Sequence, residues 1–362
     1  MRIENWLPPS KSLITNHQSL ITNHNTPVTN HNSPVTNHKK ITIMKKCFIL
    51  LAVAALCMNV ACKKDDEPIN GNNDTTPDVT VVDGITSDGA IDALFSIDVD
   101  KTVQFSRGNL QYKASKDTWR FALNQYDYIG EKNGNVSPTY DGWIDFFAWA
   151  TSGYDCGNAF FHPYDTDYED YPTYLGYGPL GVYDLVGDYA NCDWGVYNAI
   201  SNGGNKKGMW RTLSKDEWTY LFEGRSNADQ KYGIACVEGN NGMVLLPDNW
   251  VCPDSITFHP GIADADNMTE YSRYNCYDST GWFKMQKAGA VFLPAGGFRD
   301  NEEMKIKYVG DMGNYWSVTA FGANPLLDFV AYDLCFYSNY LNPADGNKPR
   351  DYGCCVRLVR DK

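Results

Sequence analysis

The sequence predicts a domain of the α+β class over residues 94–362. Short stretches in this range alternate apolar and polar residues, a pattern typical of strands. Only two stretches have the pattern of an amphipathic helix. Between these elements, aromatic residues are interrupted by Gly, Asn and Asp, which indicates long loops. Strands with few helices define the α+β class, and a chain of about 270 residues can bury a substantial core as one domain.

The clearest strand signals lie near the start and at the end of this domain. Residues 103–105 and 110–112 alternate around Arg107-Gly108-Asn109, which predicts two strands joined by a hairpin turn. At the C-terminus, Val356 and Leu358 alternate with Arg357 in the same way. We therefore expect a last strand at the end of the chain.

Two helices are predicted. The first follows Ser214, because Glu217 three residues later completes a capping box, and Gly224 can end it. Its apolar face is formed by Trp218, Leu221 and Phe222. The second helix runs from about residue 280 to residue 288 and stops at Gly289.

A targeting signal precedes the domain. Residues 44–61 join a basic start to a short apolar run and small residues, which indicates a secretory signal peptide rather than a membrane span. The cysteine at the cleavage point, Cys62, resembles that of a lipoprotein signal peptide. The resemblance implies that Cys62 is acylated and becomes the new N-terminus. Its acyl chains would bind the protein to outer-membrane lipid.

The charged tract after Cys62 resembles the surface-export signal of lipoproteins from Bacteroidota-type Gram-negative bacteria. It consists of Lys63, Lys64, Asp65, Asp66 and Glu67. The resemblance implies a lipid-anchored outer-membrane protein that faces the cell exterior. The alternative is a plain secretory signal followed by a charged linker.

Two further segments flank the signal peptide. Residues 1–43 repeat Thr-Asn-His with a seven-residue period. The histidines fit a metal site by composition, but a secretory signal must begin near the N-terminus, so we interpret this segment as a spurious upstream extension before Met44. Residues 62–93 carry the lipidated cysteine and are rich in Asp, Asn, Thr, Gly and Pro, which predicts a flexible acidic tether.

Charge excludes one large class of function. After Ala61 the chain keeps 25 basic and 43 acidic residues, a net charge of −18. Such a surface repels phosphate groups, so we expect no nucleic-acid partner. Only His162 and His259 remain after the signal peptide, which leaves little for histidine-dependent catalysis.

The cysteine pattern indicates neither a zinc site nor a thioredoxin-like motif, because no Cys-x-x-Cys pair occurs. Eight cysteines follow Cys62: Cys156, Cys192, Cys236, Cys252, Cys276, Cys335, Cys354 and Cys355. Passage through an oxidising compartment favours some disulfides, whose connectivity the sequence leaves open, and buried free thiols are the alternative. Cys354 and Cys355 are adjacent in a predicted strand and should therefore point to opposite faces.

Four segments resemble a known superfamily. Residues 210–218 are similar to the helix-opening motif of the formylglycine-generating enzyme/sulfatase-modifying superfamily, and residues 289–297, 313–317 and 356–360 follow in the same order. Together they resemble the Fibrobacter succinogenes major paralogous domain, a related group of surface proteins, over most of residues 95–361. The resemblance implies a C-type-lectin-like fold, with a twisted antiparallel sheet, two helices and long aromatic-rich loops.

The resemblance does not bring an active site with it. Oxidising members of the superfamily hold copper with two nearby cysteines, whereas this chain has only Cys335 in the comparable stretch, and Cys354 and Cys355 follow beyond it. A soft metal needs both sulfurs within bonding distance. We therefore predict no enzyme activity, no catalytic residues and no cofactor.

Metal and ligand candidates gather between residues 154 and 177. Asp165, Asp167 and Glu169 are weak calcium candidates, and a solvated acidic loop is the favoured interpretation because the spacing does not fit a calcium loop. Tyrosine is abundant there and can stack on sugars or anchor a partner, although packing within the fold is the alternative. The ligand-binding candidates are Tyr164, Tyr168, Tyr171, Tyr174 and Tyr177. We assign to the core Trp143, Trp149, Trp194, Trp210, Trp218 and Trp316.

These observations predict a surface-exposed lipoprotein with a non-catalytic, lectin-like recognition domain for a glycan or protein ligand. Two alternatives are a structural or tip component of a cell-surface appendage and a degenerate protein similar to the formylglycine-generating enzyme.

Overall fold

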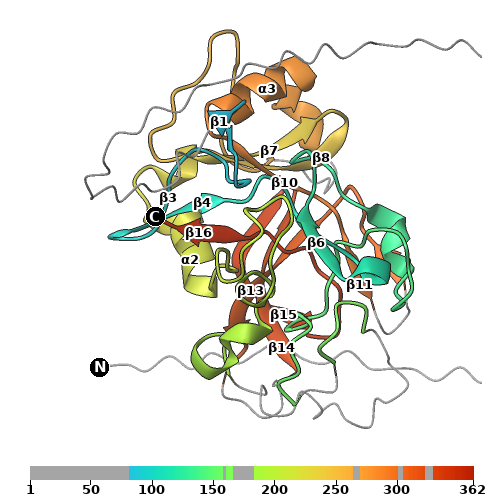
Figure 1. Cartoon of the computed structure of the whole chain (residues 1–362). Helices are drawn as coiled ribbons and strands as arrows, with labels where there is room; N and C mark the ends of the chain where they lie inside the picture. Colours follow the sequence, from blue (N-terminus) through green and yellow to red (C-terminus); the bar gives the residue numbers. More distant parts are fainter. Residues whose placement is uncertain (1–80, 158–159, 166–182, 264–269, 301–304, 323–328) are drawn as a thin grey trace, which may run out of the picture. The chain divides into compact units, whose positions relative to one another are not determined.

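The computed structural model describes residues 81–157, 160–165, 183–263, 270–300, 305–322 and 329–362. These residues belong to one compact unit, Asn73–Lys362. Most strands pair in antiparallel fashion and helices are few (Figure 1). The α+β class is confirmed.

The described strands form several small sheets rather than one twisted sheet. The largest has the order β10-β8-β7-β9 and contains β7 (Tyr232–Val237), β8 (Asn240–Leu245), β9 (Cys276–Tyr277) and β10 (Val291–Pro294). A second contains β13 (Gly313–Ala320), β14 (Val330–Tyr337) and β15 (Tyr340–Pro349), and a third contains β16 (Val359–Asp361), β4 (Lys101–Phe105) and β3 (Phe95–Asp98). The two-stranded sheets pair β1 (Val81–Val82) with β2 (Ile85–Thr86), β5 (Leu110–Lys113) with β6 (Thr118–Phe121), and β11 (Phe298–Asp300) with β12 (Lys305–Lys307).

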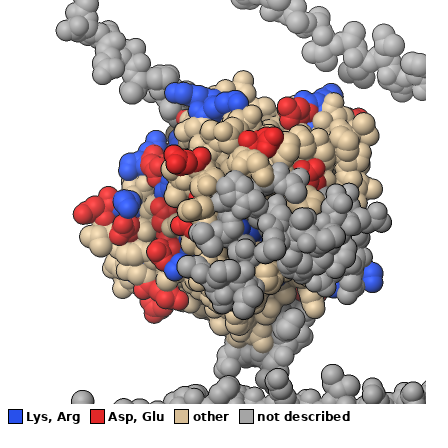
Figure 2. All heavy atoms as spheres, turned by 90° about the horizontal axis from the view of Figure 1, so that it is seen from below, with Lys and Arg blue, Asp and Glu red and all other residues tan. Residues whose placement is uncertain are grey.

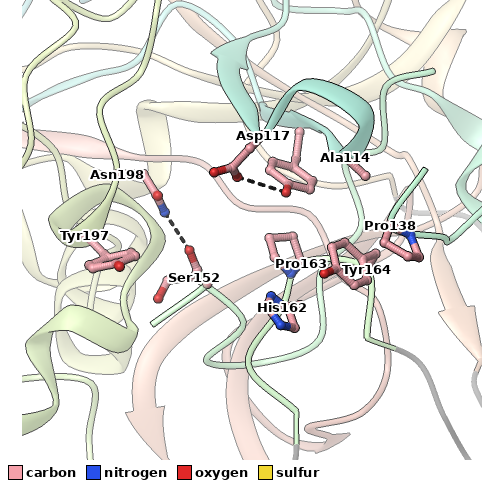
Figure 3. A pocket seen from close by; sticks show the side chains of 11 residues that line it. Ala114, Asp117, Pro138, Ser152, His162, Pro163, Tyr164, Tyr197 and Asn198 are labelled. Atoms are coloured by element: carbon pink, nitrogen blue, oxygen red, sulfur yellow. Dashed lines mark hydrogen bonds between the residues drawn. The ribbon is translucent and has the colours of Figure 1, made fainter. Parts of the chain in front are cut away.

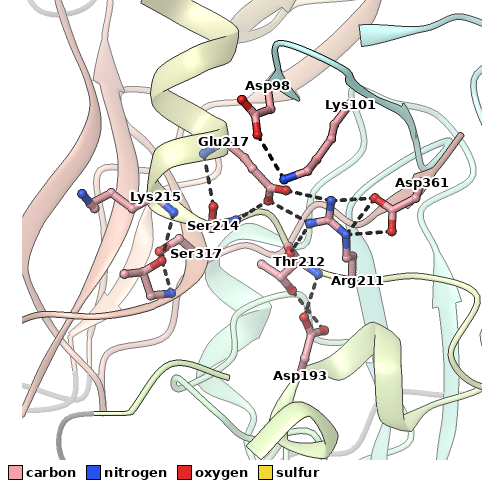
Figure 4. A network of polar contacts seen from close by, with 11 residues as sticks. Asp98, Lys101, Asp193, Arg211, Thr212, Ser214, Lys215, Glu217, Ser317 and Asp361 are labelled. Atoms are coloured by element: carbon pink, nitrogen blue, oxygen red, sulfur yellow. Dashed lines mark hydrogen bonds and ion pairs between the residues drawn. The ribbon is translucent and has the colours of Figure 1, made fainter. Parts of the chain in front are cut away.

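Both predicted helices are confirmed. α2 (Lys215–Thr219) starts from the capping box of Ser214 and Glu217 and continues as a π-helical turn, Tyr220–Gly224. The Glu217 carboxylate also accepts hydrogen bonds from Arg211, whose guanidinium reaches Asp361 in the last strand (Figure 4). The cap thus connects the helix to the C-terminus.

The second predicted helix is α3 (Ser279–Lys287), which ends where the backbone turns at Gly289, with a φ of 94°. A shorter helix, α1 (Trp194–Tyr197), was not predicted, because four residues are too few for a helical pattern. Within the described ranges, no helix has the length and apolar character needed to span a bilayer.

The predicted hairpin between residues 103–105 and 110–112 is wrong. Both segments are strands, but β4 pairs with β3 and β16, whereas β5 pairs with β6. The chain continues along the C-terminal segment instead of turning back: Ser106 N–H donates to the Leu358 carbonyl, and Leu110 N–H donates to the Val356 carbonyl. Local alternation located the strands but not their partners.

The C-terminal segment passes between two buried clusters. We call the first the tryptophan cluster; it includes Trp119, Trp149, Trp194, Trp210 and Trp316. The second, the phenylalanine cluster, includes Phe95, Phe105, Trp218, Tyr315 and Phe336. Cys354 belongs to the first and Cys355 to the second, which confirms that their side chains point to opposite faces.

Arg357 is buried although it is the polar member of the alternation. Val356 and Leu358 pack in the tryptophan cluster, and on the other side the Arg357 guanidinium donates to the Gln125 side chain at 2.7 Å. That same Gln125 oxygen accepts the Phe292 N–H at 2.9 Å. The segment therefore has two buried faces, and on the charged face Gln125 binds one guanidinium nitrogen, whereas Arg357 Nε has no hydrogen-bond partner among the described residues.

Tyr315 connects the segments that carry the family resemblance. Its hydroxyl donates to the Pro294 carbonyl at 2.8 Å and accepts from the Asn109 side chain at 3.3 Å, and the Asn109 oxygen accepts from Arg357 at 3.5 Å. Residues 289–297, 313–317 and 356–360 thus meet at the centre of the domain, linked by buried hydrogen bonds.

The domain begins before Leu94, so residues 81–93 are not part of a flexible tether. Ile91 is buried, and its N–H donates to the Phe105 carbonyl at 2.8 Å. The Asp88 carboxylate pairs with the guanidinium of Arg360 in β16. A composition rich in Asp, Asn and Gly suggested flexibility, but these residues form tight turns against the core.

Five of the six tryptophans assigned to the core are buried; Trp143 is partly exposed. The Arg120 guanidinium lies 3.8 Å from the centroid of the Trp143 ring. Its cation–π contact holds the ring at the surface.

Candidate functional site

A pocket of about 290 Å³ lies where three segments distant in the sequence meet (Figure 3). One wall is the turn between β5 and β6, the second is the loop that includes residues 152–153 and 162–164, and the third is the end of α1. Pro138 completes the lining.

The hairpin wall presents a paired phenol and carboxylate. Tyr112 lies on β5, and its hydroxyl donates to Asp117 at 3.0 Å. Asp117 follows a single 3₁₀ turn, Ala114–Lys116. The φ of Asp117 is 44°, a left-handed conformation that Asp tolerates better than most residues. Burial, with the charge of Asp117, raises the pKa of Tyr112, so the phenol remains a hydrogen-bond donor.

The loop wall presents two stacked rings. The His162 and Tyr164 rings are nearly parallel, at 9°, with centroids 4.9 Å apart. The Asp165 carboxylate accepts the N–H groups of Phe161 and His162 at 3.0 and 2.7 Å. The Phe161 carbonyl in turn accepts the Gly153 N–H at 2.7 Å. Backbone contacts therefore position the stacked pair at the pocket edge.

This use of Asp165 bears on the calcium candidates. One of its oxygens holds the loop turn, and Asp167 and Glu169 lie outside the described residues. Among the residues that the structure describes, no group of three or more His, Cys, Asp or Glu side chains could hold a metal ion.

The helix wall is anchored to the core. The Asn198 amide donates to the Ser152 carbonyl at 2.8 Å and to the Trp194 carbonyl at 3.1 Å. The buried Asp193 caps α1 by accepting the Gly195 N–H, and it also accepts the Thr212 N–H, each at 2.8 Å. α1 is thus tied both to the loop and to the motif segment at residues 210–218.

The remaining aromatic residue of this wall is Tyr197. Its ring lies 5.3 Å from that of Tyr154, and the Lys207 ammonium lies 4.3 Å from its centroid. These contacts place a partly exposed aromatic ring opposite the His162–Tyr164 stack, as Figure 3 shows.

The pocket lining combines a serine that is bound to the backbone with aromatic and polar groups. The Ser152 hydroxyl donates to the Asn191 carbonyl at 2.7 Å and is therefore engaged by the backbone rather than activated by His162. What the lining offers is ring faces, phenolic hydroxyls and the Asp117 carboxylate. Such groups bind a small polar ring through stacking and hydrogen bonds.

The sequence found only one member of this pocket as a ligand candidate, Tyr164. Outside the described residues lie Tyr168, Tyr171, Tyr174, Tyr177, the lipidation site Cys62 and the export signal Lys63–Glu67. The sequence did not indicate Tyr112, Asp117, Tyr197 or Asn198 as ligand residues. His162 was considered only as one of two remaining histidines. No local pattern could have found them, because the pocket forms where segments far apart in the chain converge.

The cysteine expected to stand alone, Cys335, has a sulfur neighbour. Cys335 and Cys354 are both buried in the tryptophan cluster; burial raises the pKa of Cys354, and the nearby Asp333 and Cys335 raise it further. Burial, reinforced by the nearby Asp333, raises the pKa of Cys335 to about 12, so the thiol stays protonated at neutral pH. A protonated thiol is a poor metal ligand.

Surface charge is mixed where it can be seen. On the described part of the face in Figure 2, acidic and basic side chains lie beside one another rather than gathering into a basic patch. The chain as a whole has a net charge of −13.

Comparison of the chain with protein-family models, with curated proteins and with solved structures finds no match. What can be said of function therefore comes from the residues and from the pocket.

Proposed function

We propose that this chain is a surface-exposed lipoprotein whose domain recognises a glycan or protein ligand without catalysis. The observation that carries the proposal is the pocket between the β5–β6 turn, the His162–Tyr164 stack and Tyr197. Its volume, about 290 Å³, lies at the lower end of the range for small-molecule sites. A single sugar ring fits that size, so a glycan is the favoured ligand.

The pocket chemistry supports a sugar over an apolar ligand. A sugar ring has C–H faces that stack on aromatic rings and hydroxyls that hydrogen-bond to carboxylates and phenols. The Tyr164 and His162 rings provide the stacking surface, and Asp117 and the Tyr112 hydroxyl provide the polar groups. A protein ligand would instead insert one side chain and contact the surface around the pocket.

The proposed domain is C-type-lectin-like and related to the Fibrobacter succinogenes major paralogous domain. Support comes from the meeting of residues 289–297, 313–317 and 356–360 at the core, and from a loop-rich architecture with few helices. The proposed anchor is acylated Cys62, with Lys63–Glu67 directing the protein to the outer surface of the outer membrane.

Glycan-array binding tests the recognition proposal. The chain from residue 62 onward, with Cys62→Ser to prevent acylation, is applied to an array, and hits are measured by calorimetry. We expect Tyr164→Ala and Tyr197→Ala to weaken binding of the best hit at least tenfold. A sugar ring stacked on one aromatic side chain should contribute about 1–3 kcal/mol to the binding free energy, as a stacked nucleobase does.

The matched control for these variants is Tyr274→Ala. Tyr274 is 43% exposed and its ring lies 6.0 Å from that of His259, but it does not line the pocket. Equal losses in all three variants would contradict the pocket as the site. If the chain bound a protein partner but no sugar, the domain would still be a recognition domain, and its ligand would be a protein rather than a glycan.

The anchor is tested separately by labelling cells with a radioactive fatty acid. The wild-type chain should incorporate the label, and detergent should be needed to release the labelled protein from the membrane fraction. Cys62→Ser should carry no label and should need no detergent for its release. Surface protease would digest the wild type on intact cells. Replacing Lys63–Glu67 by a neutral tract should then protect the protein while leaving the acylation intact.

A further inference from the structure

Besides Cys335 and Cys354, two pairs of cysteines lie next to each other in the described part of the chain. β7 and β9 run parallel, and Cys236 is the register partner of Cys276. Residues in register on neighbouring strands are about 4.8 Å apart and place their side chains on the same face of the sheet. This separation lies within the range that a disulfide spans between Cα atoms.

The ladder around this pair is intact. Cys236 N–H donates to the Asn275 carbonyl at 2.8 Å, and Glu238 N–H donates to the Tyr277 carbonyl at 3.0 Å. Burial raises the pKa of the Cys236 thiol, and the charge and hydrogen bonding of the Cys276 thiol raise it further. A bond between the sulfurs therefore needs no change in strand pairing.

The second pair joins the pocket loop to the segment before α1. Cys156 follows Ser152 and Gly153, which line the pocket, and Cys192 is the last residue of the 3₁₀ segment Gly187–Cys192. Cys192 belongs to the tryptophan cluster and Cys156 packs against it, and hydrogen bonding to the Cys156 thiol is the main cause that raises the pKa of Cys192.

We propose that Cys236 and Cys276 form one disulfide bond and that Cys156 and Cys192 form a second. The oxidant is an external disulfide, either oxidised glutathione or the disulfide of a thiol-exchange protein. The inference goes beyond ligand recognition and does not depend on what the pocket binds.

The order of steps follows from exposure. Cys276 is exposed and Cys236 is buried, so the Cys276 thiolate attacks the external disulfide first, forming a mixed disulfide and releasing one thiol. The Cys236 thiolate then attacks the Cys276 sulfur and releases the second thiol. The two cysteines lose two electrons and two protons in total, which end on the two released thiols.

Burial raises the pKa of the Cys236 thiol, which suits its place as the second, resolving cysteine. In the other pair Cys192 is buried and Cys156 is half-buried, so Cys156 should react first. Formation of this bond would connect the loop that bears His162 and Tyr164 to the α1 wall by a covalent link.

Peptide mapping tests both bonds. The chain from residue 62 onward, with Cys62→Ser, is purified reduced, oxidised in a glutathione redox buffer while folded, and then unfolded and alkylated. We expect peptides joined as Cys236–Cys276 and as Cys156–Cys192, with Cys335, Cys354 and Cys355 alkylated. Alkylation of Cys236 and Cys276 in most molecules, or a link from Cys276 to the exposed Cys252, would overturn the first assignment.

A second measurement does not depend on mapping. Oxidation should raise the Tm of the wild type, on the order of 5–10 °C for one bond that closes a loop of about 40 residues. Cys276→Ser should lose the part of this shift that belongs to the Cys236 pair, and Cys192→Ser the part that belongs to Cys156. Cys252→Ser, an exposed cysteine outside both pairs, is the control and should keep the whole shift. A wild type whose Tm is the same reduced and oxidised contradicts the proposal.

Discussion

The tryptophan cluster and the pocket are both rich in aromatic side chains, yet they use them in opposite ways. In the cluster, Trp149 and Trp316 are fully buried, and their indole N–H groups donate to the carbonyls of Ser317 and Phe147 at 2.8 and 2.7 Å. In the pocket, the rings of Tyr164 and Tyr197 stay partly exposed.

The comparison teaches how to interpret aromatic composition. A buried ring whose polar atom is satisfied by the backbone stabilises the fold, whereas a ring with an open face beside a carboxylate is available to a ligand. Composition counts both kinds alike. The exposed face distinguishes them, because even Trp194, whose buried indole nitrogen has no hydrogen-bond partner among the described residues, is fully enclosed in the cluster.

The largest effect should come from the cluster. Trp316→Ala removes a fully buried indole and its hydrogen bond to Phe147, so it should reduce the free energy of unfolding by roughly 3–5 kcal/mol. Urea unfolding measures the loss. Trp143→Ala is the control, because that ring is partly exposed, and we expect a loss below about 1 kcal/mol. Similar losses in both variants would remove the distinction between the two kinds of tryptophan.

The second effect concerns Asp193, which joins the two regions by contacting α1 and Thr212. Burial raises the pKa of Asp193 to about 6, against the lowering effect of its hydrogen bonds. The native state therefore holds this proton more tightly than the unfolded state, whose pKa is near 3.8, and stability falls as pH rises from about 4 to about 6.

Asp193→Asn removes this titration. Between pH 4 and 7 the wild type should lose roughly 1–3 kcal/mol more of its unfolding free energy than the variant does. Unfolding curves at a series of pH values measure the difference, with the exposed Asp229→Asn as control. If the unfolding free energy of the variant had the same pH dependence as that of the wild type, Asp193 would not be protonated in its site between α1 and Thr212.

A smaller effect is expected at the helix cap beside the phenylalanine cluster. Ser214→Ala removes the hydroxyl that accepts the Glu217 N–H, so it should cost about 1 kcal/mol. Thermal unfolding measures the change, and Ser214→Asp should restore most of the stability because aspartate caps helices as well. An alanine variant as stable as the wild type would mean that Arg211 and Asp361 hold this end of α2 without the cap.

The smallest effect on stability should come from the pocket. Tyr164→Ala removes a ring that is only partly buried against the tryptophan cluster, so the unfolding free energy should change by less than about 1 kcal/mol even where ligand binding is lost. Urea unfolding of the variant checks this. A loss comparable to that of Trp316→Ala would place Tyr164 with the structural aromatics and end the contrast on which the pocket rests.

The sequence by itself determined the features whose cause is local. Ser214 and Glu217 are three residues apart, so their capping box could be recognised without any knowledge of the rest of the chain. The end of α3 at Gly289 follows from one residue with a positive φ. Adjacent cysteines in an extended segment must point to opposite faces, whatever lies around them.

Only the tertiary structure decided what depends on distant partners. Alternation located β4 and β5 but could not show that both run along the C-terminal segment, because pairing is set by contacts hundreds of residues apart. The buried Arg357 guanidinium finds its hydrogen-bond partner in the distant Gln125. Residues 81–93 are held against the domain by contacts that include the ion pair between Asp88 and Arg360. The pocket likewise exists only where three remote segments meet, since the packing of the whole domain, rather than any short pattern, brings Tyr112, Tyr164 and Tyr197 together.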